Sequence, residues 1–399
     1  MLEDEALLDF EVDLAAGEVR VVDAPEEGSR ALEAAGLDAG ELDADVNALV
    51  RGRTLSAMRC DLDRILEGFG AEGQLELALR GHGASMTDHL WYRAPGSGVR
   101  WADVSFRGRE WDDGFVRCLE TGDYRHLRSC SPDVPDVTCA GHIRKAWWRQ
   151  GNGIYLLKEP LREDGVDLEG ALLASRLCDL LFGPSETGAL AVWELGGRRV
   201  SASPLLLGPD EELVGGRRLR RMSGVGVGSE GENANAMSVL ERTITGSGVR
   251  DASAHVARTL ALRNLAMLAD FHPGNYGVIR NVETGARRGA RPFDFDRALG
   301  FPSNAMSVER LCEAPELALM LCLGVFSNLK TTWDWGWYDD GVLEGFDDEI
   351  RAAYAPHAGR LPANFGDLVA QMFLEQRAYV REVAGRGGRR RPSAAGAAR

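Results

Sequence analysis

The 399-residue chain has the composition of a globular protein, with 44% hydrophobic and 27% charged residues, and is long enough for two or three domains or one two-lobed enzyme. Its formal net charge of -15 repels a nucleic-acid backbone and argues against direct nucleic-acid binding. The seven cysteines form no CxxC pair, which argues against a zinc site or a disulfide framework. No signal sequence is evident, and no apolar run reaches the ~18 residues that span a bilayer. We therefore expect a cytoplasmic protein with no membrane contact.

Residues 1–130 are predicted to form an N-terminal α/β subdomain. Alternating apolar residues predict two short strands within 6–23, and apolar residues at helical spacing predict a helix over 41–69. Residues 90–106 have strand character that a Pro-Gly-Ser-Gly turn interrupts. A stretch rich in Pro and Asp at 131–136 then predicts a boundary between subdomains.

Residues 131–206 are predicted to form the nucleotide-binding core of an N-terminal lobe. A strand, a tight Gly151-Asn-Gly153 turn and a second strand that ends at Lys158 predict a hairpin. An amphipathic helix is expected over 168–182, and a second hairpin turns at Gly196-Gly197. Burying a lysine on an apolar strand is costly unless it meets an anion, so Lys158 indicates a phosphate-binding residue. A strand-end lysine that extends to water explains the same pattern.

The second half of the chain predicts a helical C-terminal lobe. Residues 207–250, rich in Gly and Arg, are predicted to be a flexible connector, and residues 386–399 a disordered basic tail. The helical catalytic lobe is expected over 251–385, beginning with a helix over 252–268. Two strands, 276–280 and one that ends in Asp294 and Asp296, are expected to flank a Gly-rich turn at 284–290. The alternating tryptophans at 333, 335 and 337 are expected to pack this lobe or to seal an interface.

Asp270 and Asn275 have the spacing of a phosphoryl-transfer site, in which the carboxylate accepts the proton of the acceptor hydroxyl and the amide oxygen holds Mg²⁺. A capped helix end followed by a Pro-Gly-Asn turn explains the same spacing. His272 could act in catalysis or order the loop by hydrogen bonding, and we favour the ordering role. Asp294 alternates with Phe293 and Phe295, which would direct it into a cleft as a second metal ligand; the alternative is a solvated carboxylate on a strand.

Taken in order, these residues resemble the HipA-like kinases, bacterial protein kinases named for a toxin of a toxin–antitoxin pair. The catalytic stretch of that family resembles Asp270-Phe-His272-Pro-Gly-Asn275, and its metal-binding strand resembles Pro292-Phe-Asp294. Its glycine loop resembles Thr138-Cys-Ala-Gly141-His-Ile-Arg-Lys145. In the N-terminal third, Arg53, Arg59 and the stretch from Ser85 to Trp91 resemble motifs of a subgroup, so the resemblance runs from about residue 5 to residue 350.

The resemblance implies an α+β fold with two kinase-like lobes, a mixed α/β N-terminal lobe and a mainly helical C-terminal lobe. It implies ATP and Mg²⁺ as cofactors, a protein hydroxyl as acceptor and an antitoxin-like partner. The roles it implies are catalysis for Asp270 and His272 and metal binding for Asn275 and Asp294. Nucleotide binding would fall to Gly141, Lys145, Lys158 and Glu169, and Thr138 stands where the family carries a phosphorylated serine.

Three departures from the family pattern keep other functions open. Leu268 replaces an asparagine, Thr138 replaces the loop serine, and the glutamate of an N-E-x-x-A-S helix is missing. Glu169 lies two residues before that position, about 200° around a helix, so it need not reach Lys158. A nucleotide-binding pseudokinase that acts as an interaction module fits this departure. A kinase of small-molecule hydroxyl or amino groups also fits, because the site does not name its acceptor.

Overall fold

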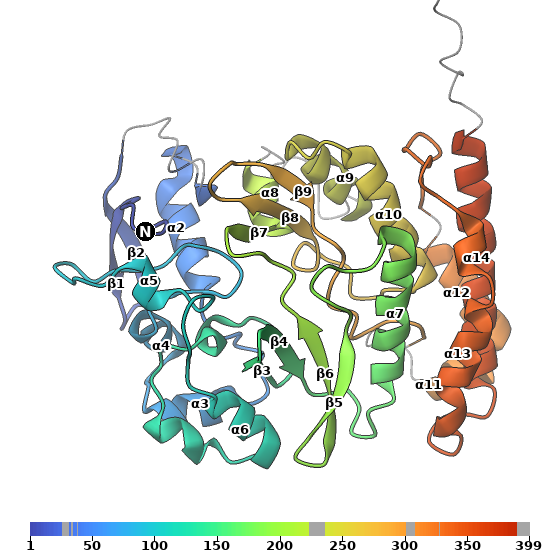
Figure 1. Ribbon diagram of the computed structural model, residues 1–399, viewed down its shortest axis with the longest axis horizontal. Coiled ribbons are helices and arrows are strands. Elements are labelled where there is room, and N and C mark those ends of the chain that lie inside the picture. The colour runs from blue at the N-terminus through green and yellow to red at the C-terminus, as the bar shows by residue number, and fades with distance from the viewer. Residues whose placement is uncertain are drawn as a thin grey trace, which may run out of the picture.

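The computed structural model describes residues 1–25, 32, 35–37, 39–222, 236–300, 308–326 and 328–388. The chain has an α+β fold with two lobes, as predicted. The N-terminal subdomain and two small sheets lie on one side and the C-terminal helices on the other (Figure 1).

The N-terminal subdomain begins with the predicted pair of strands, β1 (Asp9–Asp13) and β2 (Glu18–Asp23), which are antiparallel. The expected single helix over 41–69 is instead two helices, α2 (Leu42–Arg51) and α3 (Leu62–Phe69), separated by turns. The described residues of this part also form the α-helices α4 (Gln74–Arg80), α5 (Trp101–Val104) and α6 (Gly114–Thr121).

The strand character predicted for 90–106 is wrong. Leu90 forms only an isolated bridge with Leu2, and the segment then turns into α5. The Asp103 carboxylate accepts a hydrogen bond from the Arg100 backbone amide at 2.8 Å, which caps the helix. Local capping therefore overrides the apolar alternation of this segment.

The central sheet has four antiparallel strands in the order β3-β4-β6-β5. Both predicted hairpins are confirmed: β3 (Lys145–Gln150) with β4 (Gly153–Lys158), and β5 (Ala191–Leu195) with β6 (Arg198–Pro204). The predicted helix is α7 (Asp167–Phe182), which ends at Gly183 with φ of 82°. The lysine that ends β4 is therefore fixed by pairing on both sides of its strand.

A second sheet, β7-β8-β9, lies above the central sheet in the view of Figure 1. Its strands are β7 (Glu211–Gly215), β8 (Gly277–Asn281) and β9 (Arg287–Gly289). The predicted strand over 276–280 is confirmed, but β9 falls where only a turn was expected. The prediction of a loop-rich connector over 207–250 is wrong for the residues that form β7, α8 (Gly216–Met222) and α9 (Ala236–Gly246). The glycines at 224, 226 and 228, which belong to the stretch predicted as a flexible connector, fall outside the described residues.

The C-terminal lobe is helical, as predicted. It consists of α10 (Ala252–Leu265), α11 (Val308–Glu313), α12 (Pro315–Val325), α13 (Phe346–Tyr354) and α14 (Phe365–Gly388). The largest buried cluster joins these helices to α7 and α9, and it includes Trp333 and Trp335, in agreement with the predicted packing role. Within the described ranges, no helix combines the length and the apolar character that crossing a bilayer requires.

Candidate phosphoryl-transfer site

The centre of the site is a buried ion pair between segments that are far apart in the sequence. The Nζ of Lys158, at the end of β4, lies 2.6 Å from Oδ1 of Asp294 and 3.1 Å from Oδ2 of Asp296. Lys158 is only 7% exposed. The strand-end lysine therefore meets carboxylates instead of extending to water, and the two lobes contribute opposite charges to one site.

Charge and burial act against each other at this ion pair. Burial by itself would lower the pKa of Lys158, but Asp294 and Asp296 hold it above its usual range. Burial likewise acts to raise the pKa of Asp294, but the Lys158 ammonium keeps it well below the usual range. Burial raises the pKa of Asp296 to about 6; the Lys158 ammonium acts to lower it, and the negative charge of Asp294 acts to raise it. Lys158 and Asp294 are thus both ionised at neutral pH.

A second lysine faces the same side of the central sheet. Lys145 is the direct cross-strand partner of Lys158, and its Nζ donates a hydrogen bond to the Ala140 carbonyl at 2.9 Å. Burial lowers the pKa of Lys145, and the Lys158 charge lowers it further. Two buried ammonium groups side by side repel each other, and an anion between them would relieve that repulsion.

The glycine loop closes over Lys145. Gly141 has φ of 107°, and a Cβ atom there would lie 2.3 Å from Nζ of Lys145. Only a glycine combines this backbone conformation with room for the amine. The absent side chain thus leaves space for the lysine head group directly under the loop.

The loop that carries Asp270 is ordered by its own hydrogen bonds. Nδ2 of Asn275 donates to the Asp270 carbonyl at 2.8 Å, which leaves Oδ1 available as a ligand. Nδ1 of His272 accepts from the Gly274 amide at 2.9 Å, and its Nε2 lies 3.6 Å from Asp270 Oδ1. His272 therefore orders the loop, and the Asp270 side chain remains about half exposed, at 52%.

Backbone hydrogen bonds place this loop beside the segment that carries Asp294. The Ala290 amide donates to the Gly277 carbonyl at 3.0 Å, and the Ala269 amide donates to the Arg297 carbonyl at 3.4 Å. Asn275 and Asp294 lie between these two connections, in neighbouring stretches of chain. The structure thus brings Asp294 to the end of β4 and places the Asp270–Asn275 loop in a neighbouring stretch of chain.

The strand predicted to end in the aspartate pair is wrong, because residues 291–296 have no regular structure. Asp294 has a positive φ of 66°, which is rare for a residue with a side chain and is incompatible with a strand. Phe293 packs with the β7-β8-β9 sheet and Phe295 with the C-terminal core. The alternation seen in the sequence therefore arises from a turn held between two cores.

Glu169 is placed apart from Lys158. Its Oε1 lies 2.9 Å from Nη2 of Arg199 on β6 and 3.1 Å from Nε2 of His357. The glutamate on α7 therefore joins the central sheet to the C-terminal lobe, as its early position in the helix allowed.

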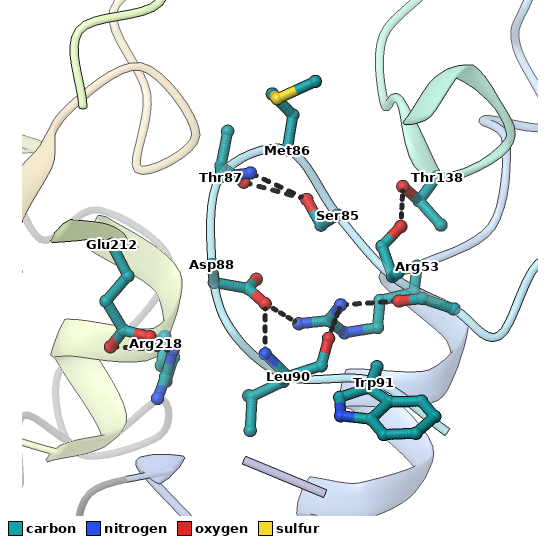
Figure 2. A network of polar contacts seen from close by, with 12 residues as sticks. Arg53, Ser85, Met86, Thr87, Asp88, Leu90, Trp91, Thr138, Glu212 and Arg218 are labelled. Carbon is teal, nitrogen blue, oxygen red and sulfur yellow. Dashed lines mark hydrogen bonds and ion pairs between the residues drawn. The ribbon is translucent and has the colours of Figure 1, made fainter. Parts of the chain in front are cut away.

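Thr138 is buried, and its Oγ1 donates to the carbonyls of Ala84 at 2.8 Å and Pro135 at 3.2 Å. It belongs to a polar network around the Ser85–Trp91 stretch (Figure 2). There the Arg53 guanidinium bonds Asp88 and the carbonyls of Gly83 and Leu90. Phosphorylation of Thr138 would require this contact to open. Arg53 and Asp88, which the subgroup motifs indicated, meet directly.

One pairing and one turn of the site were not identified by reasoning from individual residues. The pairing of Lys145 with Lys158 depends on the hairpin register, and a length count from the Gly151-Asn-Gly153 turn would have found it. The role of Asp296 depends on the turn at Asp294, for which the sequence carries no local signal.

The residues present fit a magnesium–triphosphate group. Asn275, Asp294 and Asp296 offer hard oxygen ligands. Lys145 lies under a glycine loop that a Cβ would fill, and Lys158 is its partner on the neighbouring strand. Among the described residues no group of three His, Cys, Asp or Glu side chains forms a metal site by itself. Any metal would therefore depend on Asn275 and on phosphate oxygens for part of its shell.

No protein-family model matches the chain, and no curated protein matches it. Among solved structures, it is similar to the one described as "Crystal structure of A Helicobacter pylori proinflammatory kinase CtkA", with 13% sequence identity and a TM-score of 0.44. The match covers 62% of this chain and 93% of that one.

Proposed function

We propose that the chain is a Mg²⁺- and ATP-dependent phosphotransferase, a serine/threonine protein kinase of the HipA-like type. The observation that carries this proposal is the buried contact of Lys158 with Asp294 and Asp296, beside the loop of Asp270 and Asn275. An ammonium group on one lobe and carboxylates on the other are the groups that phosphates and Mg²⁺ require.

In this proposal the two lysines bind phosphate oxygens of ATP, and Gly141 allows the loop to approach the phosphates. Asn275 and Asp294 hold Mg²⁺, which neutralises charge on the phosphates when it is bound. The half-exposed Asp270 orients the acceptor hydroxyl and accepts its proton. The hydroxyl oxygen forms the new bond to the γ-phosphorus, the bond from that phosphorus to the β–γ bridging oxygen breaks, and ADP leaves.

Transfer of label from γ-labelled ATP to the protein or to a partner tests the proposal. Asp270→Ala should reduce transfer by about 10²–10⁴-fold, the range for loss of a positioned acid–base group. Asp251→Ala is a matched control, because Asp251 starts α10 in the same lobe and makes no side-chain capping bond. Transfer that survives Asp270→Ala would remove Asp270 from the mechanism.

One observation favours a second candidate, a nucleotide-binding pseudokinase. Glu169 is engaged by Arg199 and His357, so among the described residues no helix glutamate forms an ion pair with Lys158. A rise in melting temperature with ATP and Mg²⁺, without label transfer to any protein, would favour the pseudokinase over the kinase.

The protein substrate and an antitoxin-like partner remain part of the proposal through the family resemblance. A phosphoproteomic comparison of cells that express the wild type or Asp270→Ala would test for a protein substrate. Phosphosites that depend on Asp270 would support a protein acceptor, and transfer only to free metabolites would support a small-molecule kinase instead.

A further inference from the structure

Helix α12 carries a row of exposed apolar side chains. Leu317, Met320, Leu321 and Val325 are 44%, 62%, 38% and 54% exposed, and their spacing places them on one helical face. The opposite face, with Ala318, Cys322 and Phe326, is buried in the C-terminal core. Exposed apolar side chains gathered on one face mark an interaction surface, whereas scattered ones do not.

The packing of α12 leaves this face accessible. Gln376 of α14 donates to the Cys322 carbonyl at 3.3 Å, which fixes the buried side of α12 against α14 at the edge of the lobe (Figure 1). On the exposed side, a Cβ atom at Gly324 would meet no atom of the described residues within 4 Å. A partner backbone could therefore approach closely at Gly324, between Leu321 and Val325.

The charges around the face indicate what kind of partner fits. Helices α11 and α12 carry three glutamates and a single arginine, and Glu313 and Glu316 are exposed at the start of α12. A second copy of this chain would bring acidic rims together. The basic residues 389–399 of this chain contain no large apolar side chain, so they cannot fill the face. We propose that α12 docks an amphipathic helix of a partner protein, with apolar residues on one side and Lys or Arg on the other.

The same helix ends beside the support of the Asp270 loop. The Arg263 guanidinium lies 4.7 Å from the ring centre of Phe326, at the end of α12, and 5.7 Å from that of Phe271. Phe271 directly follows Asp270. A partner on α12 would thus be separated from the Asp270 loop only by the stack of Phe326, Arg263 and Phe271. An influence of the partner on catalysis rests on the proposed function, whereas docking itself does not.

Binding of a labelled model helix tests docking without any turnover. The probe is a fluorescein-labelled peptide of about 18 residues, five turns, with Leu on one face and Lys on the other, and the comparison peptide has Glu in place of Lys. Fluorescence anisotropy would be measured with the wild type, Met320→Glu and Val325→Glu. Val22→Glu is the matched control, because Val22 on β2 is 56% exposed against 54% for Val325.

The direction of the effect separates docking from general attraction to an acidic protein. Docking on α12 predicts at least tenfold weaker binding of the Leu/Lys peptide to Met320→Glu and Val325→Glu, about 1.4 kcal/mol, and unchanged binding to Val22→Glu. Non-specific attraction predicts equal or tighter binding to all three, because each adds a negative charge. Equal or tighter binding of the Leu/Lys peptide to all three variants would overturn the proposal. Equal binding of the Leu/Glu peptide, or no binding of either peptide, would overturn it as well. Self-association of the free protein that Val325→Glu abolishes would also overturn it, in favour of a second copy.

Discussion

Replacing Lys158 by methionine would leave two carboxylates, 33% and 21% exposed, without their ion-pair partner. Removing one member of a fully buried ion pair costs about 3–5 kcal/mol, because the remaining charge stays desolvated, and the partial exposure of these carboxylates makes this value an upper bound. For a chain of 399 residues that unfolds as one unit, this corresponds to a melting temperature lower by about 4–6 °C. The loss falls on both carboxylates because Lys158 forms an ion pair with Asp294 and with Asp296.

Magnesium should restore part of this loss in the variant and have little effect on the wild type. In the wild type the Lys158 ammonium already neutralises the carboxylates, so Mg²⁺ alone would have to displace it. In Lys158→Met the two carboxylates attract a divalent cation. A Mg²⁺ concentration about 100-fold above its dissociation constant then adds about 2.7 kcal/mol, or about 3 °C.

Differential scanning fluorimetry with and without MgCl₂ at constant ionic strength measures both effects. Lys330→Met is the matched control, because Lys330 pairs with Glu241 at the surface, where its side chain is 49% exposed. Losing that pair should cost about 1 kcal/mol or less and create no response to Mg²⁺. Equal Mg²⁺ stabilisation of the wild type and Lys158→Met, or an unchanged melting temperature, would refute the proposed competition between lysine and metal.

Three other substitutions test the parts around this site. Burial raises the pKa of Asp136 to about 7, so the stability that its protonated form gives is present below the unfolded pKa and is lost as pH rises through 7. Thermal scans should therefore show that Asp136→Asn raises the free energy of unfolding by about 3 kcal/mol more at pH 8 than at pH 5. Gly141→Ala strains a backbone with φ of 107° and displaces the Lys145 amine. An ATP titration followed by melting temperature should therefore show about tenfold weaker ATP binding. Unchanged binding would show that the glycine loop does not contact the nucleotide. Arg53→Met removes the ion-pair partner of Asp88 and should lower the free energy of unfolding in urea by about 3–5 kcal/mol. Adding Asp88→Asn to this variant should recover more than about 1 kcal/mol. Additive losses from the two substitutions would contradict the pairing.

The parts of the fold that follow from local rules could be predicted from the sequence. Gly196 and Gly197 both have positive φ, as a two-residue hairpin turn requires, and the adjacent strands follow from that turn. The same holds for the hairpin that ends at Lys158, whose position on an apolar strand already indicated a buried anionic partner. These features depend on residues close together in the chain, which is why reading the sequence segment by segment identified them.

The parts that failed depend on distant pairing. Strand β7 (Glu211–Gly215) lies in a Gly- and Arg-rich stretch, and its partner β8 (Gly277–Asn281) follows only after the helices α8, α9 and α10. The short β9 needs β8 beside it, and the turn at Asp294 needs Phe293 and Phe295 to enter two different cores. A single sequence read locally carries no signal for such partners, because the free energy that selects them is released only in the assembled structure.

The arrangement around Lys158 also determines how nucleotide and metal should act together. ATP alone must separate Lys158 from Asp294 and leave the carboxylate facing phosphate, while Mg²⁺ alone must leave the ammonium facing a cation. When both enter, the phosphates replace the carboxylates at Lys158 and the metal replaces the lysine at Asp294, so no buried charge loses its partner. The ion pair therefore opposes either ligand alone and favours the complex of the two, with a coupling of about 1–3 kcal/mol if it resembles other linked sites. Under the proposed function, the side chains that mark the site in the sequence thus disfavour either ligand alone relative to the two together.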